Sequence, residues 1–367
     1  MKRFEFIAAL FGIVFIYCSN TKICRSLRLG KNDEKEEPSR NIKNEEPKLE
    51  LPPHLSNLVD LEHYFDPKFD KAQTTPFFWH VAKAAGTSVQ YYYSQCFKLI
   101  IASEIGASRA SDKLEIIKKN GIKNHINVDT SNLQGVIHAK ELGLIHSNMA
   151  QLVISPLFYE ATKELFTKDD KGVMFAMFRH PMRRVISLFY YLQTSTHEVT
   201  YNPIFAKMTI EEYAESPLLE SNFITRSLVN KMEGALSMED IETAKEILKR
   251  KCVIGLMQEF DTSIELYNDA FDFHPNFSVE LEGEENADEK SKKAKVNQCV
   301  ERLRNEGGTN KHKHTTLAED SKAYETIERK NYWDMMLWEY IVDLYREQQL
   351  NAMEKDLGFK GFFQDKA

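Results

Sequence analysis

The sequence predicts an α/β domain of three layers, in which a central, mostly parallel β-sheet lies between helices. The first observation is a repeated order, because the apolar runs TPFFWHV, AQLVISPLF and GVMFAMF are each followed by a helical pattern. Strands that alternate with helices are typical of parallel sheets with helices on their faces. The second is length, since 367 residues of which 42% are hydrophobic can enclose a sizeable core.

The helices expected after these strands have apolar residues at helical spacing and cover 86–103, 160–167 and 181–193. Further along the chain, CVIGLMQEF predicts another strand, followed by a helix over 262–271. Helices are also expected from 210 towards 230 and over 238–251. The C-terminal pattern AYETIERKNYWDMMLWEYIVDLYREQQ predicts one long helix or a bent pair that packs on the sheet.

The first residues resemble an export signal. Lys2 and Arg3 precede an apolar run from Phe4 to Cys18 that only Glu5 interrupts. This run suits a cleaved signal peptide and a short signal anchor equally well, so 1–29 is expected to lead the chain into the secretory pathway, with membrane attachment if it is not cleaved. Charged, proline-bearing sequence after it predicts a flexible stem over 30–72. The folded domain is then expected over 73–355 and a short tail over 356–367.

Composition restricts the function classes. A net charge of −7 argues against a general nucleic-acid or anionic-membrane binder. The five cysteines are scattered without Cys-x-x-Cys spacing, which predicts no metal site and mostly buried thiols, with room for one disulfide. A second charged segment, 279–297, is expected to be a disordered insertion, and Asn276 beside it begins a glycosylation sequon.

The stretch FFWHVAKAAGTSVQYYY, residues 77–93, places a lysine, a glycine and two hydroxyls where a strand passes into a helix. Ligands of open parallel sheets bind beyond the carboxyl ends of the strands. Gly86 allows close backbone approach, the following helix offers free N–H groups, and Lys83 adds a positive charge. The stretch therefore predicts a P-loop-like phosphate-binding loop. Lys83 precedes the glycine, which is unlike a Walker A motif and disfavours a kinase or another nucleoside triphosphate enzyme. A solvated loop lysine beside a plain turn glycine stays open as an alternative.

A second candidate anion site follows in FAMFRHPMRRVISLFYYLQ, residues 175–193. Arg179 ends the expected strand and Pro181 suits the first position of a helix. Arg184 and Ser187 lie three residues apart, on one helical face. A guanidinium at a strand end and a hydroxyl in the next helix can bind one phosphate through charge-assisted hydrogen bonds.

In this order and at these places, the two motifs resemble those of the PAPS-dependent sulfotransferases, especially the Golgi carbohydrate enzymes that include the heparan sulfate and uronyl 2-O-sulfotransferases. The similarity extends over about 74–350 and includes VIGLMQEFDTSIELYNDAF. The resemblance implies that the first motif binds the 5′-phosphosulfate of 3′-phosphoadenosine 5′-phosphosulfate (PAPS) and that the second holds its 3′-phosphate. The residues so assigned are Lys83, Ala85, Gly86, Thr87 and Ser88 in the first motif, and Arg179 and Ser187 in the second. Ala84 and His180 depart from the family pattern, which usually has a threonine and an aspartate there.

The resemblance implies transfer of a sulfuryl group from PAPS to a hydroxyl of a carbohydrate or glycan, in the Golgi lumen, by a single-pass membrane protein without a metal. Lys83 would be catalytic, because it can stabilise charge on the leaving phosphate. His138 and His146 lie between the motifs, where the related 2-O-sulfotransferases carry a catalytic histidine, and Glu160 is a third candidate base. Two alternatives remain open: a tyrosine or small-alcohol sulfotransferase, and a catalytically inactive lumenal protein that binds a nucleotide or a glycan. The acceptor and the oligomeric state stay undetermined.

Overall fold

The computed structural model describes residues 49–106, 111–119, 121–196, 201–278, 288–305 and 317–356. The expected export signal at 1–29, the first part of the expected stem and most of the expected tail lie outside these ranges. Within them, no helix is both long enough and apolar enough to cross a membrane.

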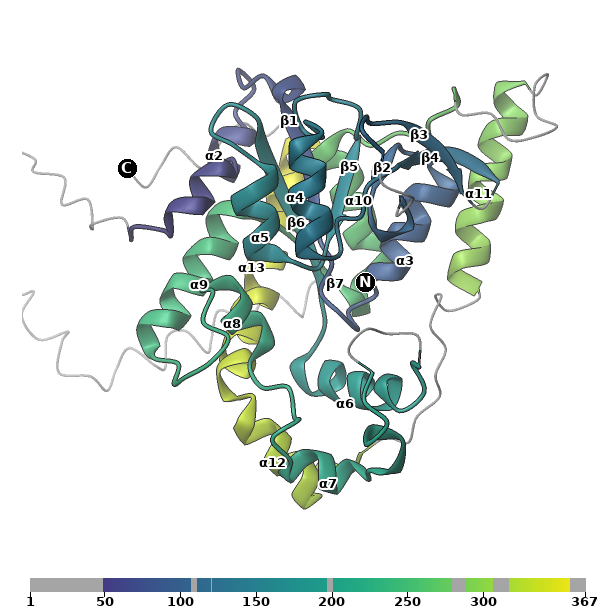
Figure 1. Ribbon diagram of the computed structural model, residues 1–367. Coiled ribbons are helices and arrows are strands. Elements are labelled where there is room, and N and C mark those ends of the chain that lie inside the picture. The colour runs from purple at the N-terminus through teal and green to yellow at the C-terminus, as the bar shows by residue number, and fades with distance from the viewer. Residues whose placement is uncertain are drawn as a thin grey trace, which may run out of the picture. The chain divides into compact units, whose positions relative to one another are not determined.

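A seven-stranded sheet forms the centre of the described structure, in the order β3-β4-β2-β5-β1-β6-β7 (Figure 1). All neighbouring strands run parallel except the edge pair β3 and β4, which is antiparallel. The prediction of an α/β fold with a mostly parallel sheet is confirmed. The strands are β1 (Thr74–Trp79), β2 (Ile101–Ala102), β3 (Ile116–Lys119), β4 (Ile122–Ile126), β5 (Leu152–Ser155), β6 (Lys171–Phe178) and β7 (Cys252–Leu256).

Hydrophobic composition explains why β1 and β6 are interior strands, with a neighbour on each side. In β6 every residue after Lys171 is buried, and β1 places Phe77 and Phe78 opposite Met174 and Phe175. Strands that are covered on both faces are expected to be apolar along their whole length rather than alternating. Three strands were not predicted: β2 falls inside the helix expected over 86–103, which ends at Cys96, and the short polar strands β3 and β4 form the sheet edge.

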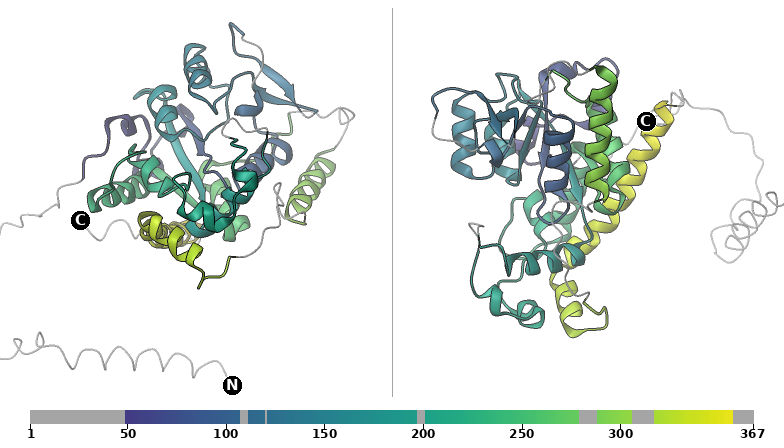
Figure 2. Two further views of the ribbon diagram at one scale, coloured as in Figure 1. Left: turned by 60° about the horizontal axis from the view of Figure 1, so that its bottom comes forward. Right: turned by 90° about the vertical axis from the view of Figure 1, so that its right-hand side faces the viewer.

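Helices cover both faces of the sheet. Figure 2 shows α4 on one side, and α11 and α13 on the other. The helices are α2 (Leu61–Tyr64), α3 (Gly86–Tyr91), α4 (Leu133–Glu141), α5 (Phe158–Glu160), α6 (Pro181–Leu192), α7 (Ile210–Glu215), α8 (Phe223–Leu228), α9 (Met238–Lys251), α10 (Phe260–Phe271), α11 (Glu289–Asn305), α12 (Lys322–Lys330) and α13 (Tyr332–Asp356). The predicted C-terminal pattern is thus a bent pair, α12 and α13. π-Helical turns continue α3 over Tyr92–Cys96 and α5 over Ala161–Leu165.

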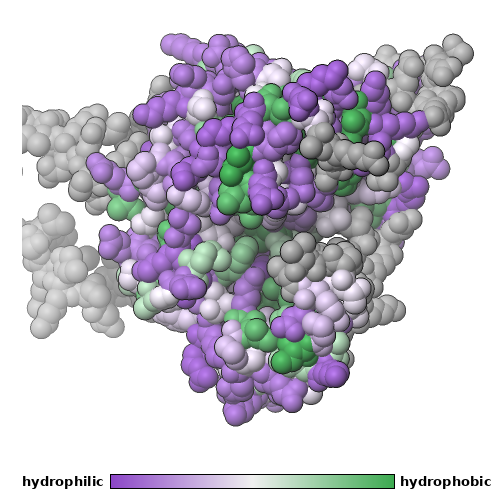
Figure 3. All heavy atoms as spheres, viewed as in Figure 1, coloured by the Kyte–Doolittle hydropathy of each residue, from purple (hydrophilic) through white to green (hydrophobic). Residues whose placement is uncertain are grey.

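A small helical lobe of α6, α7 and α12 has a hydrophobic core of its own, which includes Val185, Phe189, Tyr213 and Ile327. It lies below the sheet in Figure 1, beyond the end of β6. Because α6 begins only three residues after β6 ends, this lobe lies next to the carboxyl edge of the sheet. The face of the molecule in Figure 3 is largely hydrophilic, with hydrophobic residues in small patches.

Two segments that the sequence analysis expected to be flexible belong to the folded structure. Residues 53–72 were assigned to the stem, but Leu55, Leu58 and Tyr64 are no more than 2% exposed. The first half of α11 falls within the expected insertion, 279–297, of which 279–287 lie outside the described residues. A disulfide between Cys96 and Cys299 attaches α11 to the π-helical turn after α3. Their charge and proline content led to the prediction of flexibility. They are folded because contacts with distant parts of the chain stabilise them, and local hydrophobic patterning does not show such contacts.

Candidate functional site

The two sequence motifs follow neighbouring strands of the sheet. β1 and β6 pair in parallel, so the loop after Trp79 and the residue after Phe178 emerge at the same carboxyl edge. This is the edge at which open parallel sheets bind their ligands. The residues that follow β1 and β6 there form the candidate site.

The loop between β1 and α3 is tightly wound. Lys83 and Ala85 adopt left-handed backbone conformations, with φ of 64° and 68°, which cost about 1–2 kcal/mol each for residues other than glycine. Gly86 begins α3 where a Cβ atom would lie 2.0 Å from Cδ2 of the His80 ring. A side chain at this position therefore fits only if the His80 ring moves. Thr87 is exposed, whereas Ser88 is 7% exposed.

Contacts join the first motif to the second. The Nη1 atom of Arg179 donates a hydrogen bond to the Lys83 carbonyl oxygen, at 3.1 Å. The Lys83 ammonium lies 3.9 Å from the ring centroid of Tyr191, which is a cation–π contact. Tyr191 lies four residues after Ser187 in α6, so the two share a helical face. Lys83, Arg179 and the face of α6 that carries the half-buried Ser187 are thus brought together.

Positive charge is concentrated at the start of α6. Burial, together with the charges of Arg183 and Arg184, lowers the pKa of Arg179. Burial, and then Arg183, also lowers the pKa of His180. The buried Nδ1 atom of His180 has no hydrogen-bond partner among the described residues, and its ring lies 5.6 Å from that of Trp338. An anion bound here would offset the repulsion among the three arginines, which favours anion binding.

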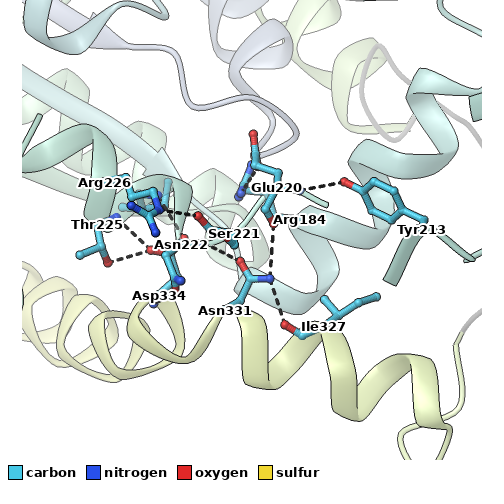
Figure 4. Close-up of polar contacts among 11 residues, drawn as sticks. Arg184, Tyr213, Glu220, Ser221, Asn222, Thr225, Arg226, Ile327, Asn331 and Asp334 are labelled. Atoms are coloured by element: carbon cyan, nitrogen blue, oxygen red, sulfur yellow. Dashed lines mark hydrogen bonds and ion pairs between the residues drawn. The ribbon is translucent and has the colours of Figure 1, made fainter. Parts of the chain in front are cut away.

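Arg184 belongs to the same motif but turns into the protein. It is 1% exposed and forms an ion pair with Glu220 (Figure 4). Its guanidinium also lies over the ring of Phe223. Its Nε and Nη1 atoms have no hydrogen-bond partner among the described residues. Arg184 therefore connects α6 to the segment before α8.

Buried side chains of α13 and its neighbours hold that segment in turn. The Asp334 carboxylate accepts hydrogen bonds from the backbone N–H groups of Ile224 and Thr225 and from the Thr225 hydroxyl. Asn331 accepts from the backbone N–H of Asn222. Figure 4 shows these contacts beside the Arg184–Glu220 pair. The position of α6, and with it of Ser187 and Tyr191, thus depends on residues more than a hundred positions away.

The candidate bases are not all at this edge. The His146 ring lies 3.4 Å from Asp170, which directly precedes the start of β6 and therefore marks the opposite, amino edge. His138 is on the solvent side of α4, 4.0 Å from Glu141 and 40% exposed. Glu160 is half-buried at the end of α5, which follows the carboxyl end of β5. Because β5 is the neighbour of β1, Glu160 is the candidate that follows the strand next to the one that leads into the Lys83 loop.

Sequence reasoning missed His80 and Glu220. His80 could have been found, because it follows β1 directly, where side chains reach the ligand edge. Glu220 carries no local signal, since its role depends on how α6 packs. A cavity of about 770 Å³ lies elsewhere, lined by residues that include Asp60, Lys171 and Lys251. It lies at the amino ends of β6 and β7 and contains none of the predicted site residues.

No protein-family model matches the chain. An uncharacterized protein of Archaeoglobus fulgidus is 26% identical over 178 residues, which cover 46% of this chain and 65% of that protein. The similarity spans less than two thirds of that relative and brings no functional description. Function is therefore inferred from the site.

Proposed function

We propose that the protein is a PAPS-dependent sulfotransferase whose acceptor is a hydroxyl of a carbohydrate. The supporting observation is the junction of the two motifs, in which Arg179 hydrogen-bonds the Lys83 carbonyl and Lys83 reaches Tyr191 on the Ser187 face of α6. A nucleotide with a phosphate at each end of its ribose needs two neighbouring anion sites. The loop over 83–88 and the start of α6 supply them.

Each site residue has a role in this proposal. The loop residues Ala85, Gly86, Thr87 and Ser88 cradle the 5′-phosphosulfate in a P-loop-like manner, and left-handed residues such as Ala85 are a component of anion-binding backbone turns. Arg179 and Ser187 hold the 3′-phosphate through charge-assisted hydrogen bonds. Lys83 stabilises the phosphate oxygen that leaves.

In the transfer step, the acceptor oxygen forms a bond to sulfur as the bond between sulfur and the bridging oxygen of the phosphosulfate breaks. The bridging oxygen takes the electron pair of that bond, and the acceptor proton passes to a base. In-line geometry and charge stabilisation account for most of the catalysis in such group transfers. Glu160 is the favoured base, because α5 follows the strand that neighbours β1.

A catalytically inactive nucleotide- or glycan-binding protein is the second candidate. It is favoured by the position of His146 at the amino edge and by the solvent exposure of His138. Such a protein would keep both anion sites and lack the proton acceptor.

A lumenal location in the Golgi, with the chain anchored through 1–29, is proposed with this function. The Cys96–Cys299 disulfide supports it, because disulfides persist in the oxidising secretory pathway and are rare in the cytosol.

Titration calorimetry with 3′,5′-diphosphoadenosine tests the nucleotide site. Wild type should bind, and Arg179→Ala should bind about 10- to 100-fold more weakly, because a charged hydrogen bond is lost. Arg346→Ala is the matched control, since Arg346 is an exposed arginine on α13 and is not among the predicted site residues. Equal thermal unfolding of the variants would show that the fold is retained. Absence of binding by wild type would exclude both the sulfotransferase and an inactive PAPS-binding form.

A radiolabelled sulfate-transfer screen over glycans, tyrosine peptides and small alcohols then separates enzyme from binder. Lys83→Ala should lower kcat by about 100-fold or more, as loss of a preorganised transition-state cation does. Glu160→Gln should lower it while leaving diphosphoadenosine binding unchanged. Full turnover by Lys83→Ala would contradict the mechanism, and no transfer to any acceptor would favour the inactive binder.

A further inference from the structure

A second concave surface lies beside the disulfide, where α11 packs against the π-helical turn after α3. This basic groove has a volume of about 270 Å³ and is lined by four cationic side chains: Lys98, Lys292, Lys295 and Arg302. Among its described lining residues there is no aspartate or glutamate. The described part of the lining therefore carries positive charge, in a chain whose net charge is −7.

Helical geometry gathers these charges. Lys292, Lys295, Cys299 and Arg302 are spaced by three or four residues, so they lie on one face of α11. The disulfide from Cys299 to Cys96 holds that face against the π-helical turn. Figure 1 shows α11 beside α3. The cationic side chains of α11 that line the groove thus lie on one face of the helix and are not spread around it.

The walls of the groove are ordered by hydrogen bonds. The Arg302 Nη2 atom donates to the Tyr91 hydroxyl at 2.6 Å, and the Lys292 ammonium donates to the Phe277 carbonyl at 3.5 Å. The Asn276 backbone N–H donates to the Phe97 carbonyl at 2.7 Å. Opposite α11, the wall therefore includes the partly buried aromatic residues Tyr91 and Phe277 beside the cations.

We propose that the basic groove binds a segment of an anionic polysaccharide, through uronate or sulfate groups on its sugars. Its volume is below the range of about 300–1,000 Å³ for sites that enclose a small molecule, so an extended chain that crosses the surface suits it better. Cations bind carboxylate and sulfate by charge-assisted hydrogen bonds, and aromatic rings pack on the apolar faces of sugars. The choice of a glycan, rather than an acidic peptide, rests on the proposed carbohydrate sulfotransferase function.

The position of the groove defines a site separate from the transfer centre. Lys83 and Arg179 lie at the carboxyl edge, whereas the groove is lined by Tyr91 and residues after it, beyond the end of α3. A long glycan held in the groove would be retained between transfer events, which raises its effective concentration at the active site.

Fluorescence anisotropy of the full-length protein with a labelled heparin octasaccharide tests the proposal. The double variant Lys292→Gln/Lys295→Gln should bind at least about fivefold more weakly and show a shallower dependence on salt, because two cationic contacts are removed. Lys290→Gln/Lys293→Gln is the matched control, with the same loss of charge on the same helix outside the groove lining. It should bind like wild type.

Equal loss in both double variants would overturn the proposal, since it would reveal general attraction to a basic helix. Binding of poly-glutamate as tight as that of heparin would overturn the glycan assignment. Arg179→Ala should retain heparin binding, so the groove can be tested even if diphosphoadenosine fails to bind.

Discussion

At the residue scale, the lack of a side chain at Gly86 allows the loop between β1 and α3 to pass close to the His80 ring. The His80 ring occupies the space in which a Cβ would stand, with Cδ2 and Nε2 at 2.0 and 2.3 Å. Lys83 and Ala85 already hold left-handed φ values, so the backbone around Gly86 has little freedom to move away. The ring and the loop therefore constrain one another.

Gly86→Ala is expected to lower the free energy of unfolding by about 1–3 kcal/mol, as overpacking of a tight site does. In a His80→Ala background the same substitution should be less destabilising, because the clashing ring is gone. Urea unfolding of the four proteins gives the double-mutant cycle. An equal loss of stability in both backgrounds would show that the His80 ring is not the cause.

At the element scale, β4 carries polar residues into the sheet. Asn124 is buried and its Nδ2 atom donates to the carbonyl oxygens of Ser94 and Leu99, at 2.7 and 3.0 Å. His125 is also buried, and neither ring nitrogen has a hydrogen-bond partner among the described residues. Burial, and then the charge of Lys119, lowers the pKa of His125 to about 4. The folded protein therefore holds this ring neutral.

Stability should fall as the pH drops from about 6.5 to about 4. Over this range His125 binds a proton in the unfolded chain but stays neutral in the folded chain. The free energy of unfolding therefore falls by about 3 kcal/mol through this residue. Urea unfolding at several pH values measures it. His125→Leu should flatten this dependence. An unaltered pH dependence in His125→Leu would contradict the assignment.

At the scale of the whole molecule, the segment before β1 closes the amino edge of the sheet. Leu58 forms a bridge with Gly172 of β6, and the Lys251 ammonium donates to the Leu58 carbonyl at 2.8 Å. Asp60 pairs with Arg250 and Lys251, at 3.0 and 3.1 Å. Burial raises the pKa of Asp60, but these two cations outweigh it and hold the pKa below its usual value. The domain thus begins well before the first strand.

Leu55→Ala tests whether this segment is part of the core. Leu55 is fully buried, so its truncation should cost about 2–5 kcal/mol of unfolding free energy. Ser56→Ala, at the exposed neighbour, should change stability by less than about 0.5 kcal/mol. Denaturant unfolding compares the two variants. A Leu55→Ala protein as stable as wild type would support the original prediction that this segment is a flexible stem.

The elements predicted best were those with strong local patterns. The helix over 238–251 was found with its bounds, because Ser237 and Asp240 form a capping box before an amphipathic run. The strands β1, β5, β6 and β7 are short apolar runs that local hydrophobicity reveals. β4 was missed because buried Asn124 and His125 break the apolar pattern, and their burial depends on distant partners.

The candidate site divides in the same way. Lys83, Gly86, Arg179 and Ser187 could be chosen from the sequence, because each follows a strand end or starts a helix and carries chemistry that suits an anion. The base could not be chosen, since His138, His146 and Glu160 all lie between the motifs along the chain. Only the pairing of β5 with β1 and the contact of His146 with Asp170 separate them in space.

Local sequence was therefore enough for the alternation of strands and helices and for the choice of two candidate anion-binding motifs, because these depend on neighbouring residues. The tertiary structure decided the order of the strands, the folding of the segment before β1 and the joining of Cys96 to Cys299 across 203 residues. It also decided which residues of the two motifs are in contact, such as Arg179 with the Lys83 carbonyl. Such features arise from contacts between distant parts of the chain, and hydrophobic periodicity within a short window does not report on them.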